Sequence, residues 1–417
     1  MDKQLSTFVK ILKDKQYAIL LNTTNYCIVK FPCEQIDYIN KTISITKSEK
    51  DKLSKLGFFV KDEIIAEKVM NVRSLTQSTL HIIISFTQEC NLSCKYCSQY
   101  DSKDFGLISE EILIDIVNYV QSICEKFSFK NIQIDLFGGE PLLAVQRIFF
   151  LKDLLESSIN IPVFYTLETN GLGINKSIIN SFKNLKVFVT LSSLRDHDQY
   201  RVTHDGGYGT YNEIIRNLID VNNLFDDHHS LCIRYNVNEE NKKLLREFLE
   251  GVNLINLNYS EIQIAYTYEF NNPDFINRLS YDEYKKWYID EAIDILLEYN
   301  IKIYMPNITY SSCMAYQLGN LKIFPDGKVG MCNAFKYKNR NLNLADILND
   351  INIFEKSKNK ESVLDEKCLH CEDLLFCGGK FFCKKPNYCD YFDMDIDSLL
   401  LKYISKIGTE KEKLFII

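Results

Sequence analysis

The stretch Cys90-Asn-Leu-Ser-Cys94-Lys-Tyr-Cys97 decides how the rest of the sequence is interpreted. Its three cysteines have the spacing CxxxCxxC and follow residues 80–86, an apolar run of strand length. Three thiolates on one tight loop can hold three corners of a cubic iron–sulfur cluster. A structural zinc site would more often use four ligands in two CxxC-like pairs. The spacing therefore favours an iron–sulfur cluster with one open iron, where an exogenous molecule can bind.

The cysteine content of the chain does not indicate a secreted, disulfide-rich protein. The chain has 417 residues and 14 cysteines, an even number, but disulfide scaffolds are usually short. Its first 21 residues, MDKQLSTFVKILKDKQYAILL, carry scattered charges and no small-residue cleavage site of a signal peptide. No apolar run approaches the ~18–20 residues of a membrane span. We therefore expect a cytoplasmic protein that does not engage a membrane, whose cysteines are thiolate ligands or core residues.

Composition narrows the choice of partners. The net charge of −7 argues against a general nucleic-acid-binding protein, which is normally basic. Glycine and proline are sparse, with 16 and 7 residues, so long flexible linkers are not expected. We expect a folded chain of two or three domains without a nucleic-acid partner.

From residue 80 to about residue 266, short β-branched or aromatic runs alternate with helical patterns. Ser109 is a candidate N-cap, and an apolar face recurs through residue 127. The predicted strands are 80–86, 132–137, 162–168, 187–191, 231–237 and 261–266, and further helices are predicted at 211–224, 239–249 and 281–299. This alternation predicts parallel strands with right-handed helical crossovers, hence an α/β barrel or part of one. Functional residues are expected at the carboxyl ends of the strands.

The cysteine loop resembles that of the radical S-adenosylmethionine (SAM) enzymes, whose hallmark is CxxxCxΦC with an aromatic residue, here Tyr96, before the last cysteine. Gly138-Gly139-Glu140 ends the second predicted strand and matches the family's GGE motif, which binds the methionine amino group. A carboxylate can neutralise an ammonium group, and glycines allow close approach of a backbone. The resemblance implies a partial (β/α)6 radical SAM barrel with a 4Fe–4S cluster on Cys90, Cys94 and Cys97. It also implies that a 5′-deoxyadenosyl radical forms and abstracts hydrogen from the substrate.

The resemblance implies further cofactor contacts at the later strand ends. The candidates are Thr169, Asn170, Thr190, Ser192, Arg201 and Arg234. This chain keeps His197-Asp198 and Arg201 but has Ser192-Ser193 where the family usually has Asp-Gly. Arg201 could instead be a solvated arginine at a helix start, and Arg234 could be structural. No catalytic acid or base is assigned.

A second cysteine group lies in residues 305–395, which show few regular elements and would need covalent or metal staples to fold. It comprises Cys313, Cys332, Cys368, Cys371, Cys377, Cys383 and Cys389. Zinc is one interpretation of these cysteines. They also resemble the SPASM domain of peptide-modifying radical SAM enzymes, which houses two auxiliary 4Fe–4S clusters and would bring the total to three.

One departure from the SPASM pattern affects the ligand assignment. Five residues separate Cys377 from Cys383, where the family usually has three. The resemblance implies an outer cluster on Cys368, Cys371, Cys377 and Cys389 and an inner cluster on Cys313, Cys332 and Cys383. The inner cluster would then lack one cysteine and could have an open iron. The isolated Cys27, Cys33, Cys124 and Cys232 are expected to be structural.

Residues 1–75 have a different pattern. Strands are predicted at 17–21 and 26–31, around a four-residue turn, and a helix at 48–56 that ends at Gly57. This pattern resembles the winged-helix-like module that binds the leader of a ribosomally made precursor peptide by strand addition. A DNA-binding winged helix and a purely structural cap are the alternatives, and no basic face favours the first.

The combined interpretation divides the chain into a leader-recognition module (1–75), a radical SAM barrel (78–300), a Cys-rich SPASM domain (305–395) and a C-terminal helix and tail (396–417). It predicts a radical SAM maturase that forms a thioether or carbon–carbon crosslink in a precursor peptide, with SAM as cofactor and flavodoxin or ferredoxin as reductant. A sulfatase-type formylglycine maturase and a non-catalytic metal-binding interaction protein are the alternatives. The sequence does not indicate an oligomeric state.

Overall fold

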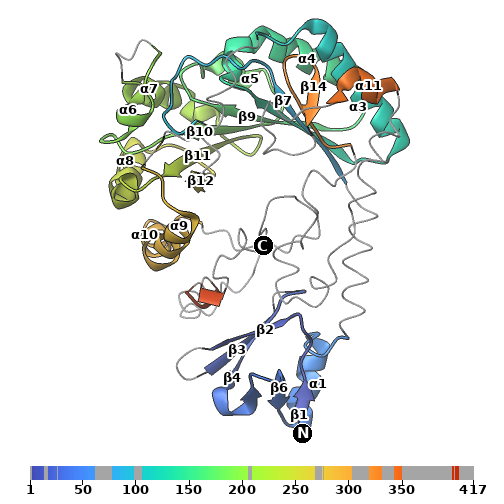
Figure 1. Cartoon of the computed structure of the whole chain (residues 1–417), viewed down its shortest axis with the longest axis vertical. Coiled ribbons are helices and arrows are strands. Elements are labelled where there is room, and N and C mark those ends of the chain that lie inside the picture. Colours follow the sequence, from blue (N-terminus) through green and yellow to red (C-terminus); the bar gives the residue numbers. More distant parts are fainter. Residues whose placement is uncertain are drawn as a thin grey trace. The chain divides into compact units, whose positions relative to one another are not determined.

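The computed structural model describes residues 2–13, 17–25, 27–61, 78–97, 106–204, 209–267, 275, 277–302, 319–330, 342–349, 397–398 and 400–402. They fall into two compact units, which are treated separately here (Figure 1). The first unit contains the described residues up to 61 and those after 396, and the second contains the rest. Among the described helices, none is both long and apolar enough to cross a membrane.

The second unit is built on a nine-stranded sheet with the order β12-β11-β10-β9-β8-β7-β13-β14-β15. The strands are β7 (Thr79–Ser85), β8 (Asn131–Phe137), β9 (Val163–Thr169), β10 (Leu185–Thr190), β11 (His229–Val237), β12 (Glu261–Tyr266), β13 (Leu321–Ile323), β14 (Lys328–Gly330) and β15 (Leu342–Asn343). Strands β7 to β12 are parallel, and each pairs with the next one along the chain. The predicted α/β fold with six parallel strands in sequence order is therefore confirmed.

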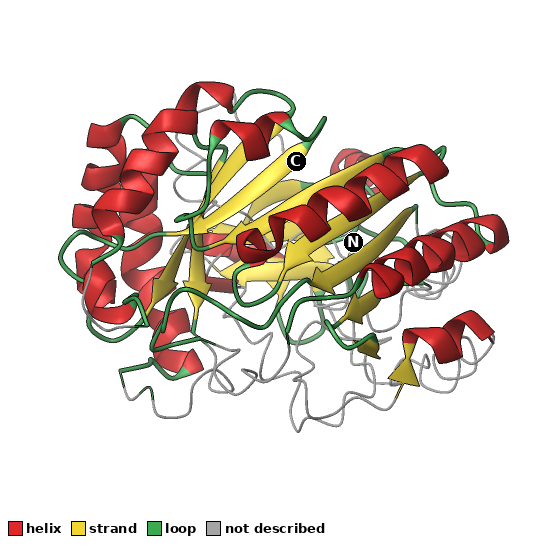
Figure 2. Ribbon diagram, turned by 90° about the horizontal axis from the view of Figure 1, so that it is seen from above, coloured by secondary structure: helices red, strands yellow, loops and turns green. Residues whose placement is uncertain are grey.

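Helices connect these strands and lie along the outside of the sheet (Figure 2). The α-helices are α3 (Glu110–Lys126), α4 (Val145–Ser158), α5 (Lys176–Asn180), α6 (His197–Tyr200), α7 (Tyr211–Val221), α8 (Leu245–Ile255), α9 (Tyr281–Trp287), α10 (Ile293–Glu298) and α11 (Leu344–Asn349). Short 3-10 turns occur at η2 (Pro141–Ala144), η3 (Asn222–Leu224) and η4 (Asn241–Leu244), and a π-helical turn η5 (Tyr288–Ala292) joins α9 to α10. Ser109 caps α3 as predicted, because its side chain accepts a hydrogen bond from the Ile112 N–H.

The two faces of the parallel sheet differ in polarity. Residues such as Ile134, Leu167 and Val189 are fully buried in one core with the helices. The residues that alternate with them are half-buried and often polar, for example Asp135 on β8 and Glu168 on β9. Alternating side chains point to opposite faces of a strand, so the second face is lined by polar groups.

Strands β13–β15 were not anticipated. β13 pairs in parallel with β7, with Leu321 opposite Ile82, and so extends the sheet beyond its first strand. The Tyr119 hydroxyl on α3 donates a 2.7 Å hydrogen bond to the Gly319 carbonyl, just before β13. The described strands of residues 305–395 thus extend the nine-stranded sheet. The domain limits drawn from the sequence stay predictions.

The first unit contains two three-stranded sheets, β1-β6-β5 and β2-β3-β4. Its elements are β1 (Asp2–Gln4), β2 (Val9–Lys13), β3 (Tyr17–Asn22), β4 (Ile28–Pro32), η1 (Cys33–Gln35), β5 (Ile36–Asp37), β6 (Thr42–Ser44) and α1 (Lys47–Lys55). The antiparallel β3–β4 pair confirms the predicted hairpin. Thr46 and Glu49 form a capping box that starts α1.

A C-terminal segment packs against the β2–β3 hairpin within this unit. Leu400 is 1% exposed and clusters with Leu12, Ile19 and Leu21. The Asp397 carboxylate lies 2.7 Å from the buried Lys10 amino group. Asp397 and Leu400 thus contact the β2–β3 hairpin of the N-terminal module. The winged-helix character of this module stays a prediction.

Candidate active site

The cysteine loop follows β7 and is held by a short backbone ladder. Leu92 and Thr203 form an antiparallel bridge. The Ser93 N–H donates to the Val202 carbonyl (2.8 Å), and the Lys95 N–H donates to the Tyr200 carbonyl (3.0 Å). Residues 92–95 are therefore paired with residues 200–203, at the end of α6 and just after it. This pairing fixes the loop that carries Cys90, Cys94 and Cys97 at the carboxyl end of the sheet, where the sequence placed it.

The glycines of the GGE segment pack against the chain that leads into the cysteine loop. A Cβ on Gly138 would lie 2.4 Å from the Thr87 carbonyl oxygen, and one on Gly139 would lie 2.2 Å from that of Glu89. The Gly139 and Glu140 N–H groups donate to the Thr87 and Glu89 carbonyls, both at 2.8 Å. The two glycines are thus required for contact between two protein loops, a role that the sequence argument did not include.

Glu140 is buried, and its carboxylate ties the turn after β8 to the end of β9. Its carboxylate accepts hydrogen bonds from the Thr169 hydroxyl (2.8 Å), the Asn170 N–H (2.7 Å) and the Leu142 N–H (3.0 Å). Burial raises the pKa of this carboxyl group, and the hydrogen bonds from Asn170 and Thr169 act in the opposite direction. Three of its roughly four acceptor positions are used, so one remains for a cationic ligand group.

Asn170 links the end of β9 to the first cysteine. Its side-chain amide donates to the Asn91 side-chain oxygen (2.6 Å) and lies 3.9 Å from the Cys90 sulfur. Its side-chain oxygen accepts from the Leu172 N–H (2.9 Å). The predicted cofactor residues Thr169 and Asn170 thus lie at the cysteine loop, where they position Glu140 and Cys90.

Arg201 is a buried cation with no carboxylate partner in the part of the chain that the structure describes. Its guanidinium donates to the Tyr96 hydroxyl (3.3 Å) and the Asn170 carbonyl (3.1 Å), and its Nε has no hydrogen-bond partner among the described residues. It is 3% exposed, which excludes the solvated helix-start alternative. An unpaired buried charge is costly, so this position calls for an anion.

The serines that replace the family's Asp-Gly have structural partners. The Ser192 N–H donates to His197 Nδ1 (3.2 Å), and the Ser193 hydroxyl donates to Glu247 (3.1 Å). Burial and, to a smaller degree, the Arg201 charge lower the pKa of His197 to about 2, so its ring is neutral. The Asp198 carboxylate accepts from two N–H groups at the start of α7. His197 and Asp198 therefore fix the segment that presents Arg201.

Arg234 lies in a different setting from Arg201. It is half-buried on β11, where its guanidinium pairs with Glu168 on β9 (3.0 Å) and donates to Gln263 on β12 (2.7 Å). Thr190, the last residue of β10, is its register partner. Both predicted residues lie near the carboxyl ends of their strands, but the charge of Arg234 already has a protein partner.

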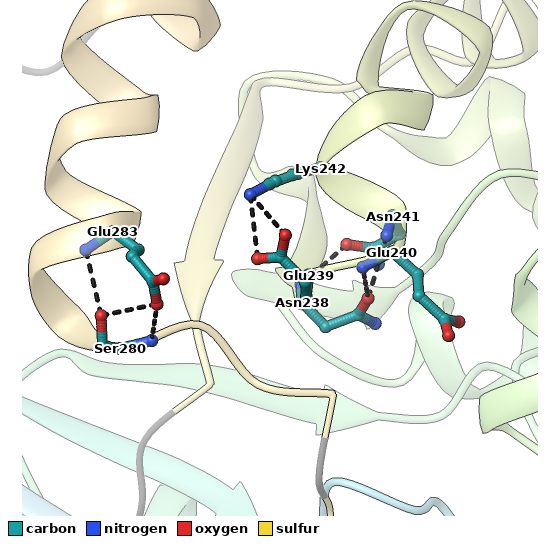
Figure 3. A network of polar contacts seen from close by, with 7 residues as sticks. All are labelled: Asn238, Glu239, Glu240, Asn241, Lys242, Ser280 and Glu283. Atoms are coloured by element: carbon teal, nitrogen blue, oxygen red, sulfur yellow. Dashed lines mark hydrogen bonds and ion pairs between the residues drawn. The ribbon is translucent and has the colours of Figure 1, made fainter.

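Three aromatic side chains, Tyr96, Tyr200 and Phe275, pack together beside Cys94 of the loop. The ring of Phe275 contacts Tyr96 and Tyr200 edge-on, with centroids 6.2 and 5.7 Å apart. The Tyr200 hydroxyl donates to the Glu240 carboxylate, and the turn after β11 that carries Glu240 is fixed by Asn238. Figure 3 shows this turn and the start of α9, with Asn238, Glu239, Glu240, Asn241, Lys242, Ser280 and Glu283.

Three thiols on one loop suit an iron–sulfur cluster by their chemistry, and the Arg201 guanidinium suits an anionic cofactor group. Among the described residues, no group of three His, Cys, Asp or Glu side chains is placed to hold a single metal ion. Burial raises the pKa of the Cys90 thiol to about 11. Burial also raises the pKa of the Cys94 thiol. Thiolates at these positions therefore need a strong cationic partner, which cluster irons would supply. The guanidinium of Arg201 offers the matching site for a carboxylate.

Sequence reasoning missed four residues that hold this site: Asn91, Tyr200, His204 and Phe275. Asn91 lies within the cysteine loop itself. Tyr200, His204 and Phe275 belong to no recognisable motif, and only the fold brings them to the loop. The seven cysteines of the second group, from Cys313 to Cys389, lie outside the described residues. Cys232 is buried on β11 and Cys124 is half-buried against the core, consistent with structural roles.

Comparison with known proteins agrees with this geometry. Residues 84–252 match the Radical SAM superfamily. The chain is 26% identical over 325 residues to the radical SAM cyclopropyl synthase TigE of Paramaledivibacter caminithermalis, covering 72% of this chain and 66% of that protein. It is 25% identical over 345 residues to the cysteine-type anaerobic sulfatase-maturating enzyme of Clostridium novyi, covering 72% and 87%.

A solved structure shares the fold. The structure of anSMEcpe with bound AdoMet and Kp18Cys peptide has a TM-score of 0.61 at 19% identity, covering 79% of this chain and 99% of that chain. The matched segment 84–252 contains the cysteine loop, the GGE segment and Arg201. Residues 84–252 therefore form a radical SAM domain, within a chain that is an enzyme.

Proposed function

We propose that this enzyme is a maturase that modifies a ribosomally synthesised precursor peptide by forming a thioether or carbon–carbon crosslink. The observation that carries the proposal is the cysteine loop beside the buried guanidinium of Arg201, whose charge has no carboxylate partner among the described residues. The two curated relatives support it, since both are named as radical SAM or maturating enzymes and one is named for maturing a sulfatase, which is itself a protein.

In this proposal each residue of the site has its own role. Cys90, Cys94 and Cys97 would hold the 4Fe–4S cluster, and Arg201 would bind the carboxylate of SAM. The Glu140 carboxylate keeps one acceptor position for the amino group of SAM while its other hydrogen bonds fix the loop. Cluster and SAM together supply a 5′-deoxyadenosyl radical that removes a hydrogen atom from the substrate. The protein's part is to orient the reactants and exclude water from them.

Two further parts of the proposal concern the ends of the chain. The second cysteine group would hold two auxiliary 4Fe–4S clusters, the inner one with an open iron that can bind the substrate. The N-terminal module would hold the leader by strand addition, for which the edge strands β2 and β4 offer unpaired sides within the described sheet. A flavodoxin or ferredoxin would supply electrons in a reducing cytoplasm.

A leader-dependence experiment tests this function. The reconstituted, reduced enzyme is given SAM and a leader-bearing precursor peptide encoded beside its gene, and the product is analysed by mass spectrometry. We expect a loss of two hydrogens per crosslink, and turnover at least ~10-fold slower when the leader is removed, which corresponds to about 1.4 kcal/mol of leader binding. Equal turnover of the leaderless core would contradict the role of the N-terminal module.

A sulfatase-type maturase is the second candidate, because the Clostridium novyi enzyme aligns over 87% of its length. That function predicts oxidation of a short sulfatase-derived peptide at its cysteine or serine to formylglycine, without any leader. The same enzyme preparation can be offered both peptides in parallel. The peptide that is modified identifies the function, and production of 5′-deoxyadenosine with neither peptide modified points to a different substrate.

A further inference from the structure

We infer that His204 is a positioning residue for the cysteine loop: its ring fixes the Cys90 carbonyl and thereby sets how firmly the first cluster ligand is held. The inference rests on the proposed cluster site. His204 belongs to no motif of the sequence and follows directly on residues 200–203, which pair with the loop.

Both nitrogens of the His204 ring contact the cysteine loop. Nδ1 lies 2.8 Å from the Ser93 hydroxyl oxygen, and Nε2 is hydrogen-bonded to the Cys90 carbonyl. A carbonyl can only accept, so Nε2 carries the proton. In the neutral ring Nδ1 is then the acceptor, and the Ser93 hydroxyl donates to it. One side chain thus spans the loop from its first ligand to the residue before its second.

The backbone ladder does not reach Cys90. Its described contacts involve residues 92 to 95, beginning at the bridge between Leu92 and Thr203. At the Cys90 sulfur, the Leu92 N–H is 3.4 Å away and the Asn170 amide 3.9 Å, so these contacts involve the side chain of Cys90 and not its carbonyl. The hydrogen bond from His204 fixes the Cys90 carbonyl, one residue after the Glu89 carbonyl that accepts from the Glu140 N–H.

Because His204 is exposed, replacing it should affect the cysteine loop without preventing the domain from folding. His204 is exposed, and its described partners lie in the cysteine loop. Removing its ring should therefore leave the barrel intact and loosen the loop at Cys90. A looser first ligand lets an iron leave the cluster more readily, because a thiolate that swings away exposes the metal.

The test compares rates of iron loss in three variants. His204→Ala removes both contacts, His204→Gln keeps an amide N–H near the position of Nε2, and His228→Ala removes an exposed histidine just before β11. Each protein is reconstituted anaerobically, and iron release to a ferrous chelator is followed with the electron paramagnetic resonance spectrum of the reduced cluster. Far-UV circular dichroism checks that each variant is folded.

We expect iron release from His204→Ala to be about three- to tenfold faster than from the wild type, the worth of one or two hydrogen bonds. His204→Gln should be within about twofold of the wild type, as should His228→Ala. Equal rates for wild type and His204→Ala, or no rescue by glutamine, would overturn the inference. A wild-type chain that binds no cluster would instead overturn the proposed site itself.

Discussion

Two arginines of the barrel, both predicted to contact the cofactor, lie in opposite electrostatic settings. Arg201, after α6, is 3% exposed, has no carboxylate partner among the described residues and keeps one N–H unpaired. Arg234, on β11, is half-buried and pairs with Glu168 at 3.0 Å. The first position is a charged site that lacks its counter-ion, and the second is a pair that is already neutral.

Arg201 and Arg234 therefore differ in role, although the sequence predicted a cofactor contact for both. A buried guanidinium is costly without an anion, so we propose that Arg201 binds an anionic ligand. The ion pair at Arg234 fixes the geometry of the polar sheet face between β9, β11 and β12. The contrast can be tested by treating the two arginines identically.

The largest expected effect is on SAM binding. Arg201→Gln should weaken SAM binding about 30- to 100-fold, because a charge-assisted hydrogen bond of roughly 2–3 kcal/mol is lost. Arg234→Gln should change it by less than about fivefold, since its charge is paired with the protein. Equilibrium binding of SAM to the reconstituted, unreduced enzyme measures both. Similar losses in the two variants would remove the distinction.

A second prediction concerns pH and the histidine beside Arg201. Burial, aided by the Arg201 charge, lowers the pKa of His197 to about 2, whereas its unfolded value is near 6.5. The unfolded chain therefore binds more protons below pH 6.5, and stability is lost as the pH falls through that value. The contribution is about 1.4 kcal/mol for each pH unit.

His197→Gln should remove this dependence. The unfolding free energy of the cluster-free chain, measured by denaturant titration at pH 7 and pH 5.5, should fall less in the variant than in the wild type by about 1.4 kcal/mol. The comparison of slopes cancels any constant destabilisation by the substitution. Parallel slopes in the two proteins would show that His197 is protonated in the folded state.

The smallest expected effect tests the structural pair. Glu168→Gln, Arg234→Gln and the double variant form a double-mutant cycle on thermal unfolding. We expect a coupling energy on the order of 0.5–1 kcal/mol, because both side chains are about one-quarter exposed and screened by solvent. A coupling near zero would mean that the ion pair does not stabilise the sheet.

The sequence predicted the sheet well and the contacts poorly. Six strands and the capped helix α3 followed from periodicity, because buried strands and amphipathic helices carry strong local signals. Strand β13 is three residues long and pairs with β7 from about 240 positions away, so no local pattern reveals it. Helix α8 begins at Leu245, later than predicted, because Asn238 organises a turn there first.

The site shows the same division. Cys90, Cys94, Cys97 and the GGE segment were found because their chemistry is encoded at fixed spacing. The buried hydrogen bonds of Glu140 depend on tertiary contacts, and so does the burial of Arg201 away from any described carboxylate. No sequence pattern encodes either of them. His204 and Phe275 were missed because histidine and phenylalanine are common in many roles, and only the fold brings them to the loop.

The central claim is that the three-cysteine loop supports radical cleavage of SAM. The direct measurement is 5′-deoxyadenosine formation by the reconstituted, reduced full-length chain, compared with a variant in which Cys90, Cys94 and Cys97 are all replaced by alanine. We predict product from the wild type and none above background from the variant, whose second cysteine group is unchanged. No product from an iron-loaded wild-type chain, or equal product from both proteins, would contradict the account.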